Sequence, residues 1–216
     1  MKFLILSGFL LVFKLDPNAQ LQVSMHWGSE EIALGKWYQL RSDSLTFQEI
    51  KCYLSDFTFE KEGRKQVIVG PILFDAEDSS TWTILKNFPV KDYKSISFHF
   101  GMDSLYHVSE ILEGPLNPMN GMYWAWNSGY IQFKCTGNSS SLPISDQQFE
   151  YHLGGYRQPY ETMVPVELVL KGTHLILDLK PFFENTVNFQ QAQRIIIPGK
   201  TAKDYCQKLS PYFYSE

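Results

Sequence analysis

The sequence predicts an all-β protein, an antiparallel β-sandwich with one or two short helices. Short apolar runs recur along the chain, and several alternate apolar with polar residues as half-buried strands do. Glycine and proline, with 14 and 11 residues, interrupt these runs. Aromatic residues make up 15% of the chain, and so many rings need a deep core. An α+β fold is the alternative.

The N-terminal segment resembles a secretory signal peptide. Met1 and Lys2 form a short positive start, and Phe3 to Phe13 is an apolar run. This run is too short to span a bilayer, which takes ~20 residues. Pro17 to Ala19 supplies a cleavage context, so we expect a signal peptide at 1–19 and a single domain at 20–216. A buried N-terminal helix is the alternative. The exported chain is then periplasmic or secreted, and we expect no transmembrane segment in it.

Charge and cysteine content set further bounds. The net charge of −4 offers no basic field for nucleic acid. An oxidising compartment allows one disulfide among three cysteines, but the sequence does not choose the pair. Because Cys52 lies on the apolar face of a predicted strand, we expect it to be a buried thiol. Cys135 and Cys206 then remain as the expected pair.

The first half of the chain reads as a series of strands. Residues 21–26 alternate, with Leu21, Val23 and Met25 on one face and His26 on the polar face. Further strands are expected at 51–59, 66–69, 81–88 and 93–100, with a hairpin turn around Gly63.

A long connection follows at 102–121, and it contains His107. A connection of this length inside a compact domain is usually functional.

The stretch from Pro118 to Cys135 is the most aromatic part of the chain. Trp124 and Trp126 are two residues apart, so in a strand both indoles lie on one face. Two core tryptophans in a β-sandwich are one interpretation. Rings that line a functional pocket are the other.

The second half adds three more strands and a helix. In the strand expected at 148–153, Glu150 and His152 share a face. Residues 163–170 and 174–179 read as a strand pair that turns at Lys171 and Gly172. Thr201 can cap a last helix through about Leu209.

Catalytic motifs are absent from the sequence. It contains no GxSxG, no HExxH, no P-loop and no catalytic cysteine context, so we expect a protein that is not an enzyme. Five histidines remain: His26, His99, His107, His152 and His174. Each alone is typical of a surface or hydrogen-bonded histidine. Two that converge would form a metal site, and neutral imidazole suits copper.

Several segments carry a family resemblance. They are ISFHFGMDSLYHVSEILEGPLNPMNGMYWAWNSGYIQFK, FQEIKCYLSDFTF and FEYHLGGY. The chain resembles the MbnP-like copper-binding proteins, relatives of the methanotroph surface proteins MopE and CorA, through most of its exported part.

The resemblance implies an exported β-rich protein that holds Cu(I). In copper-binding relatives the ligands are two histidines and a kynurenine, which a dihaem partner of the cytochrome c peroxidase type makes from a tryptophan. It implies His152 and the loop residue His107 as ligands, with His26, beside Trp27, as a further candidate.

The chain also departs from this pattern at one position. Relatives place the oxidised tryptophan just before the loop histidine, where this chain has Leu105 and Tyr106. Trp124 and Trp126 are then the alternative positions for an oxidised tryptophan. The hypothesis is an exported copper-binding protein. The alternative is a metal-free periplasmic β-sandwich interaction module.

Overall fold

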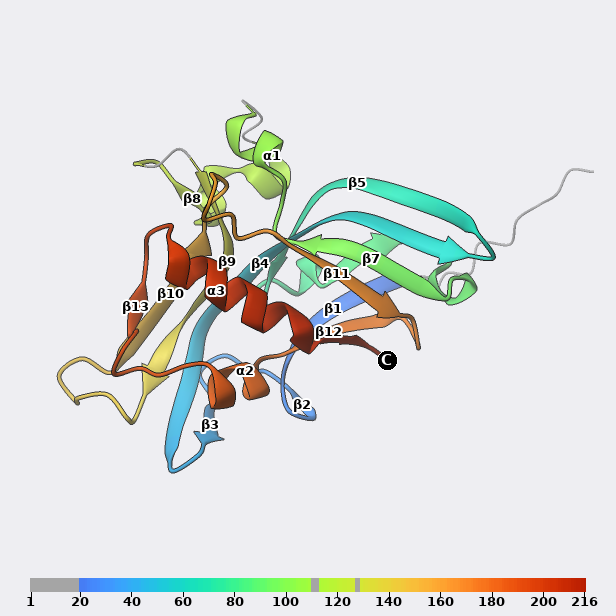
Figure 1. Cartoon of the computed structure of the whole chain (residues 1–216). Helices are drawn as coiled ribbons and strands as arrows, with labels where there is room; N and C mark the ends of the chain where they lie inside the picture. The colour runs from blue at the N-terminus through green and yellow to red at the C-terminus, as the bar shows by residue number, and fades with distance from the viewer. Residues whose placement is uncertain (1–19, 110–112, 127–128) are drawn as a thin grey trace, which may run out of the picture.

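The computed structural model describes residues 20–109, 113–126 and 129–216 (Figure 1). The expected signal peptide at 1–19 lies outside the described residues. Strands dominate and form two curled sheets that pack as a sandwich, so the all-β prediction is confirmed.

The smaller sheet has five strands in the order β14-β12-β1-β2, with β6 also paired to β1. Their bounds are β1 (Gln20–Trp27), β2 (Glu30–Glu31), β6 (Thr83–Lys86), β12 (His174–Asp178) and β14 (Phe213–Ser215). Burial alternates along all of β1, as its sequence predicts.

The larger sheet has nine strands in the order β11-β7-β4-β9-β10-β13, with β3 and β5 on β4 and β8 on β9. Their bounds are β3 (Trp37–Leu40), β4 (Asp43–Lys61), β5 (Arg64–Asp75), β7 (Ser95–Phe100), β8 (Tyr123–Trp124), β9 (Gly129–Ser139), β10 (Gln148–Gly154), β11 (Val164–Val169) and β13 (Arg194–Ile195).

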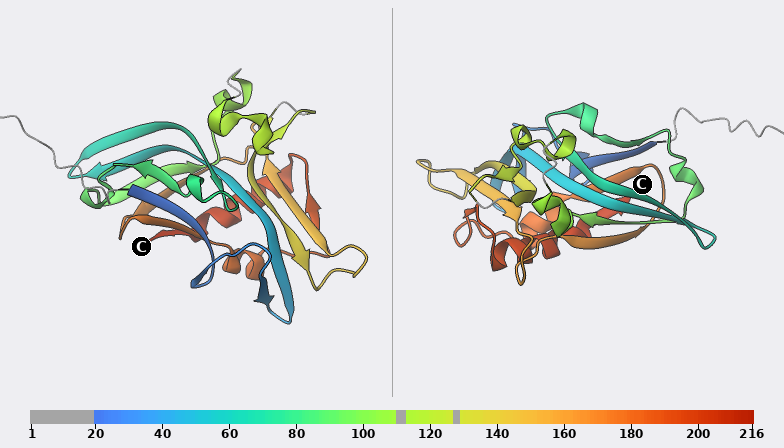
Figure 2. Two further views of the ribbon diagram at one scale, coloured as in Figure 1. Left: turned by 180° about the vertical axis from the view of Figure 1, so that it is seen from behind. Right: turned by 90° about the horizontal axis from the view of Figure 1, so that it is seen from above.

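Strand β4 connects the two ends of this sheet. Its first half pairs with β3 and β9, and its second half pairs with β5 and β7. A bulge at Asp56, with φ of +54°, separates the two halves. In the view from behind in Figure 2, the long strand runs from one end of the molecule to the other.

The main core lies between the two sheets and beneath two helices, α2 (Leu179–Asn185) and α3 (Lys200–Leu209). Phe47, Phe149 and Phe183 form its centre, with ring centroids 5.4 to 6.3 Å apart. Tyr205 of α3 packs on Tyr151 of β10 at 5.6 Å. This core covers one face of β10.

The opposite face of β9 and β10 is covered by a segment that we call the cap. It comprises the described residues of 102–126, with the short helix α1 (Ser104–Val108), two 3-10 turns and β8. Figure 1 shows α1 and β8 standing together above one end of the sheet. A second, smaller core joins the cap to the strands: Tyr53, Met102, Leu116, Met122, Trp124, Tyr130 and Ile131.

Three details differ from the sequence prediction. The sheets are mixed, because β1–β12 and β10–β13 are parallel pairs. The described chain contains three α-helices. The strands β11 and β12 do not form a hairpin: β11 pairs with β7 in one sheet and β12 with β1 and β14 in the other.

The expected disulfide between Cys135 and Cys206 is wrong. All three cysteines are free and buried, and burial raises the pKa of each thiol. Cys135 of β9 and Cys206 of α3 both lie in the main core, and no bond joins them. The prediction that Cys52 is a buried thiol is confirmed.

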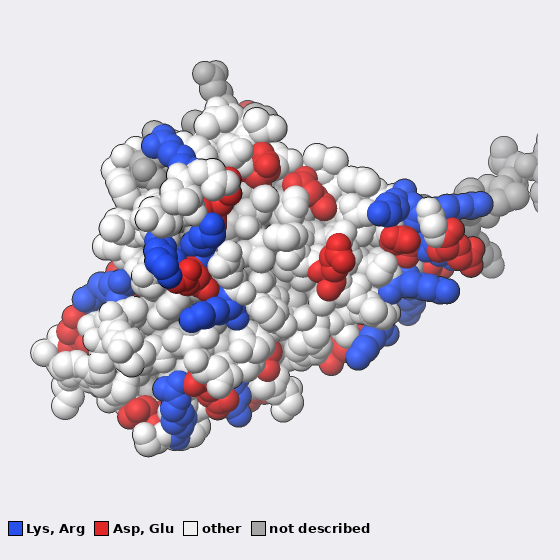
Figure 3. All heavy atoms as spheres, in the orientation of Figure 1, with Lys and Arg blue, Asp and Glu red and all other residues white. Residues whose placement is uncertain are grey.

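No described helix is both long and apolar enough to cross a membrane. Acidic and basic side chains are interspersed on the face in Figure 3, with a mixed group at the β4–β5 end of the molecule. The face shows no extended basic surface.

Candidate metal site

His152 lies on β10, opposite Lys134 of β9. The alternation of β10 puts Glu150 on the same face, as the sequence predicts. The Nε2 atom of His152 is buried and makes no hydrogen bond within the described part of the chain. The nearest carboxylate oxygen, Oε1 of Glu150, is 3.2 Å from it.

Ion pairs surround His152 on this face. Arg194 donates two hydrogen bonds to Asp146, at 2.9 and 2.6 Å, and its Nε is 3.9 Å from Oε2 of Glu150. On the other side, Lys134 pairs with Glu49 at 3.0 Å. Burial lowers the pKa of His152, Glu150 opposes this and Lys134 adds to it. The imidazole is therefore neutral near pH 7, which is the form that binds metals.

Trp124 packs beside this site. A Cβ atom at Gly154, two residues beyond His152, would lie 2.8 Å from the Trp124 indole, so the ring rests on the glycine. Strand β8 ends at Trp124, so the prediction that one strand face carries both tryptophans is wrong. The Trp126 ring is 64% exposed and contacts Trp124 at a centroid distance of 5.6 Å.

His107 lies on α1 and is buried between the cap and β9. Its Nδ1 accepts a hydrogen bond from the backbone N–H of Tyr130 at 3.0 Å. Its Nε2 is 2.8 Å from the side-chain nitrogen of Gln132. The ring stacks on Tyr156 with a centroid distance of 4.6 Å. Burial lowers the pKa of His107 to about 4.

The Gln132 amide is held in one orientation. Its oxygen accepts from the Met102 N–H at 3.0 Å, and its nitrogen donates to the Met102 carbonyl at 3.1 Å. Donors therefore face both nitrogens of His107, although a neutral imidazole has one acceptor. A ligating histidine normally donates its second N–H to a carbonyl or carboxylate. In this arrangement His107 does not fit a metal ligand.

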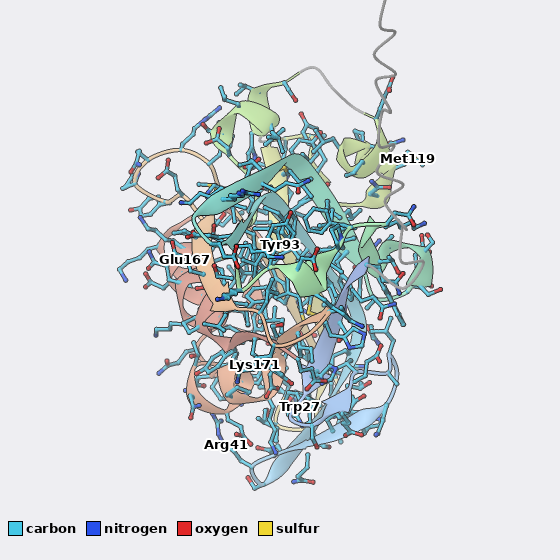
Figure 4. All side chains as sticks on the ribbon, turned by 90° about the vertical axis from the view of Figure 1, so that its right-hand side faces the viewer. Trp27, Arg41, Tyr93, Met119, Glu167 and Lys171 are labelled. Atoms are coloured by element: carbon cyan, nitrogen blue, oxygen red, sulfur yellow. The ribbon has the colours of Figure 1, made fainter. Side chains whose placement is uncertain are left out.

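The structure brings His107 and His152 to the same face of β9 and β10. His107 contacts Gln132, and His152 lies opposite Lys134. Gln132 and Lys134 are two residues apart on β9, so their side chains point to the same face. His26 belongs to the five-stranded sheet, where it pairs with Asp178 and Glu31. Figure 4 shows its neighbour Trp27 near one end of the molecule and Met119 of the cap near the other. His26 therefore does not join the other two.

Sequence reasoning missed three residues around His107: Gly129, Gln132 and Tyr156. Gly129 gives them room, because a Cβ there would lie 3.2 Å from Tyr156 and 3.4 Å from Nδ1 of His107. Gln132 reads as a solvent-facing residue of an alternating strand, yet it is fully buried. Gln132 points to the face opposite Ile131 and Phe133. The sequence indicates that it is buried only once the cap is known to cover that face.

Within the described ranges, no three or more His, Cys, Asp or Glu side chains gather closely enough to hold a metal ion. His152 and Glu150 are the two donors that this face offers at close range.

A family model described as MbnP matches residues 16–202. The chain belongs to the MbnP family. Its fold is similar to that of MbnP from Methylosinus trichosporium, with a TM-score of 0.53, 15% sequence identity and 78% of each chain covered. No curated protein matches the sequence.

Membership in the MbnP family confirms the resemblance on which the site prediction rests. The match includes the cap, β9 and β10, and therefore both His107 and His152. At 15% identity the structural similarity establishes the fold, and the ligands must be argued from this chain's own side chains.

Proposed function

We propose that this MbnP-family chain is an exported copper-binding protein with His152 as its central ligand. The observation that carries the proposal is the buried Nε2 of His152, which has no hydrogen-bond partner among the described residues. A buried polar atom without a partner costs about 1 to 3 kcal/mol. A metal ion at this nitrogen offsets that cost.

The residues on this face fit copper in part. Imidazole is a favoured copper ligand, and the lowered pKa keeps His152 neutral. His107 would become a ligand only after the ring left Tyr130 and Gln132. In the described arrangement it instead fixes α1 to β9. Bound copper would supply a redox-active cation. We assign no catalysis to the protein.

The oxidised tryptophan and its dihaem partner remain part of the proposal. Trp126 is exposed enough for a partner to reach it, and Trp124 lies directly behind it. Mass spectrometry of tryptic peptides from the native protein tests whether either indole has become kynurenine.

A metal-free interaction module is the second candidate. The cap favours it by exposing four large apolar side chains, which are Leu105, Val108, Met119 and Trp126. Exposed apolar groups of this size often mark a surface for another protein. The engagement of Nδ1 of His107 by the Tyr130 N–H also agrees with this function.

Copper retention separates the two candidates. The exported protein is loaded with Cu(I), loose metal is removed, and copper per chain is measured for the wild type, His152→Ala and His174→Ala. His174 is an exposed histidine on β12 that contacts Gln22 at 2.6 Å, so it is the matched control. We expect stoichiometric copper in the wild type and control and its loss from His152→Ala. Equal copper in all three, or none in the wild type, contradicts the proposal.

A further inference from the structure

The contact between His152 and Glu150 is close but is not a hydrogen bond. Nε2 and Oε1 are 3.2 Å apart, yet Nε2 has no partner that meets hydrogen-bond geometry in the described chain. The contact is an ion pair only when the imidazole is protonated, so a neutral ring leaves this buried Nε2 without a partner.

The separation matches that of two ligands on one cation. Two donor atoms that each lie about 2.1 Å from a metal ion are about 3.0 to 3.4 Å apart when the ligand angle is between about 90° and 110°. The 3.2 Å between Nε2 and Oε1 falls inside this range. A cation placed between them would satisfy both atoms at once.

The surroundings leave Oε1 of Glu150 available for this role. The other oxygen, Oε2, faces Arg194 at 3.9 Å, and Asp146 holds that guanidinium in place. The ammonium of Lys134, across from His152, is paired with Glu49. The positive charges nearest the pair are therefore both engaged by carboxylates.

We propose that Glu150 is a second metal donor and makes this an imidazole–carboxylate site for a divalent ion such as Cu²⁺ or Zn²⁺. The inference rests on the proposed site at His152 and names the class of ion that it takes. Carboxylate oxygen is a hard donor that suits divalent ions, whereas Cu⁺ prefers softer ligands. Glu150 keeps 29% of its side chain exposed, so water can complete the coordination.

The test compares ions and variants. Cu²⁺ is titrated with detection by electron paramagnetic resonance, Zn²⁺ by calorimetry, and Cu⁺ by competition with a coloured chelator. The proteins are the wild type, Glu150→Gln and Glu167→Gln. Glu167 is an exposed carboxylate on β11, at the other edge of the nine-stranded sheet (Figure 4), and is the matched control. Arg194→Gln is added because Glu150→Gln also weakens the pairing with Arg194.

Glu150→Gln removes a direct ligand, so we expect the affinity for Cu²⁺ and Zn²⁺ to fall by at least the roughly tenfold to hundredfold that loss of an outer-shell partner costs. Glu167→Gln and Arg194→Gln should retain wild-type affinity, and Cu⁺ binding should change much less. If Glu150→Gln keeps the wild-type affinity for divalent ions, Glu150 is not a ligand. If Arg194→Gln lowers that affinity as much as Glu150→Gln does, the proposed role of Glu150 is also overturned. A wild type that binds Cu⁺ but no divalent ion overturns this inference and leaves the proposed function intact. A wild type that binds none of the ions overturns both.

Discussion

At the scale of single residues, two histidines under the same cap have different surroundings. His107 has a donor against each ring nitrogen, whereas Nε2 of His152 has none in the described chain. Spacing along the sequence does not reveal this difference. It places His107 in a long loop and His152 on the polar face of a strand, and neither position shows which ring nitrogens have partners. Their roles depend on partners from distant strands.

The buried neutral ring of His107 predicts a pH dependence of stability in the metal-free protein. Its pKa falls from 6.5 to about 4 on folding, so the unfolded chain takes up a proton that the folded chain refuses. The contribution of His107 to the unfolding free energy should therefore be fully present above pH 6.5 and should decline as the pH falls toward 4. The full loss is on the order of 3 kcal/mol.

Urea unfolding at pH 7 and pH 5 measures this effect. His107→Gln should show a smaller loss of unfolding free energy between the two pH values than the wild type. His174→Gln should behave like the wild type, since His174 lies exposed on β12. An unchanged pH slope in His107→Gln would show that another group carries the effect.

At the scale of elements, the cap is tied to the sheet by a row of charges. The ammonium groups of Lys51 and Lys134 donate to the carbonyls of Asn120 and Gly121, both at 3.2 Å. Glu49 lies between the two lysines, at 3.4 and 3.0 Å. These side chains are largely covered, so their pairing is screened less than that of surface charges.

Removing the central carboxylate should loosen the cap. Glu49→Gln leaves two mostly covered lysines with less compensation, and we expect a loss of about 1 to 3 kcal/mol in unfolding free energy. Glu30→Gln is the control, because the Glu30–Lys36 pair is about half exposed and should contribute less than about 1 kcal/mol. Hydrogen exchange at residues 119–123 should quicken in Glu49→Gln alone. Equal losses in the two variants would contradict the structural role of Glu49.

Elements defined by local alternation could be predicted from the sequence. β1, β7 and β10 alternate over at least six residues, and so the shared face of Glu150 and His152 was predictable. The pairing of β12 with β14 was not, because β14 comes from the C-terminal end: His174 and Glu216 exchange backbone hydrogen bonds. That pairing depends on a contact 42 residues away in sequence, which no local pattern encodes.

The surroundings of the candidate site were less predictable for the same reason. Gln132 alternates with apolar residues in the sequence, and the folded cap buries it completely. Trp126 was expected to share a strand face with Trp124, but β8 ends at Trp124, two residues earlier. The ligand candidates followed from the residues, whereas their availability depends on tertiary contacts.

At the scale of the whole molecule, the two sheets divide the histidines. His107 and His152 lie with the nine-stranded sheet and its cap, whereas His26 and His174 lie on the five-stranded sheet. His99 is on β7, where it contacts Asp56 at 3.3 Å. His99 and His174 therefore serve as internal controls, whereas Nδ1 of His26 is, like Nε2 of His152, buried without a hydrogen-bond partner among the described residues.

Nuclear magnetic resonance of the five histidine rings, before and after one equivalent of Cu⁺ or Zn²⁺, tests the central claim most directly. Both ions are diamagnetic, so each ring nitrogen can be followed in the ¹⁵N-labelled protein. We expect the ring signals of His152 to shift most. The signals of His107 should still show Nδ1 accepting a hydrogen bond from Tyr130. The signals of His26, His99 and His174 should not shift. Unchanged His152 signals, with the ion bound at another histidine or not at all, would contradict the account.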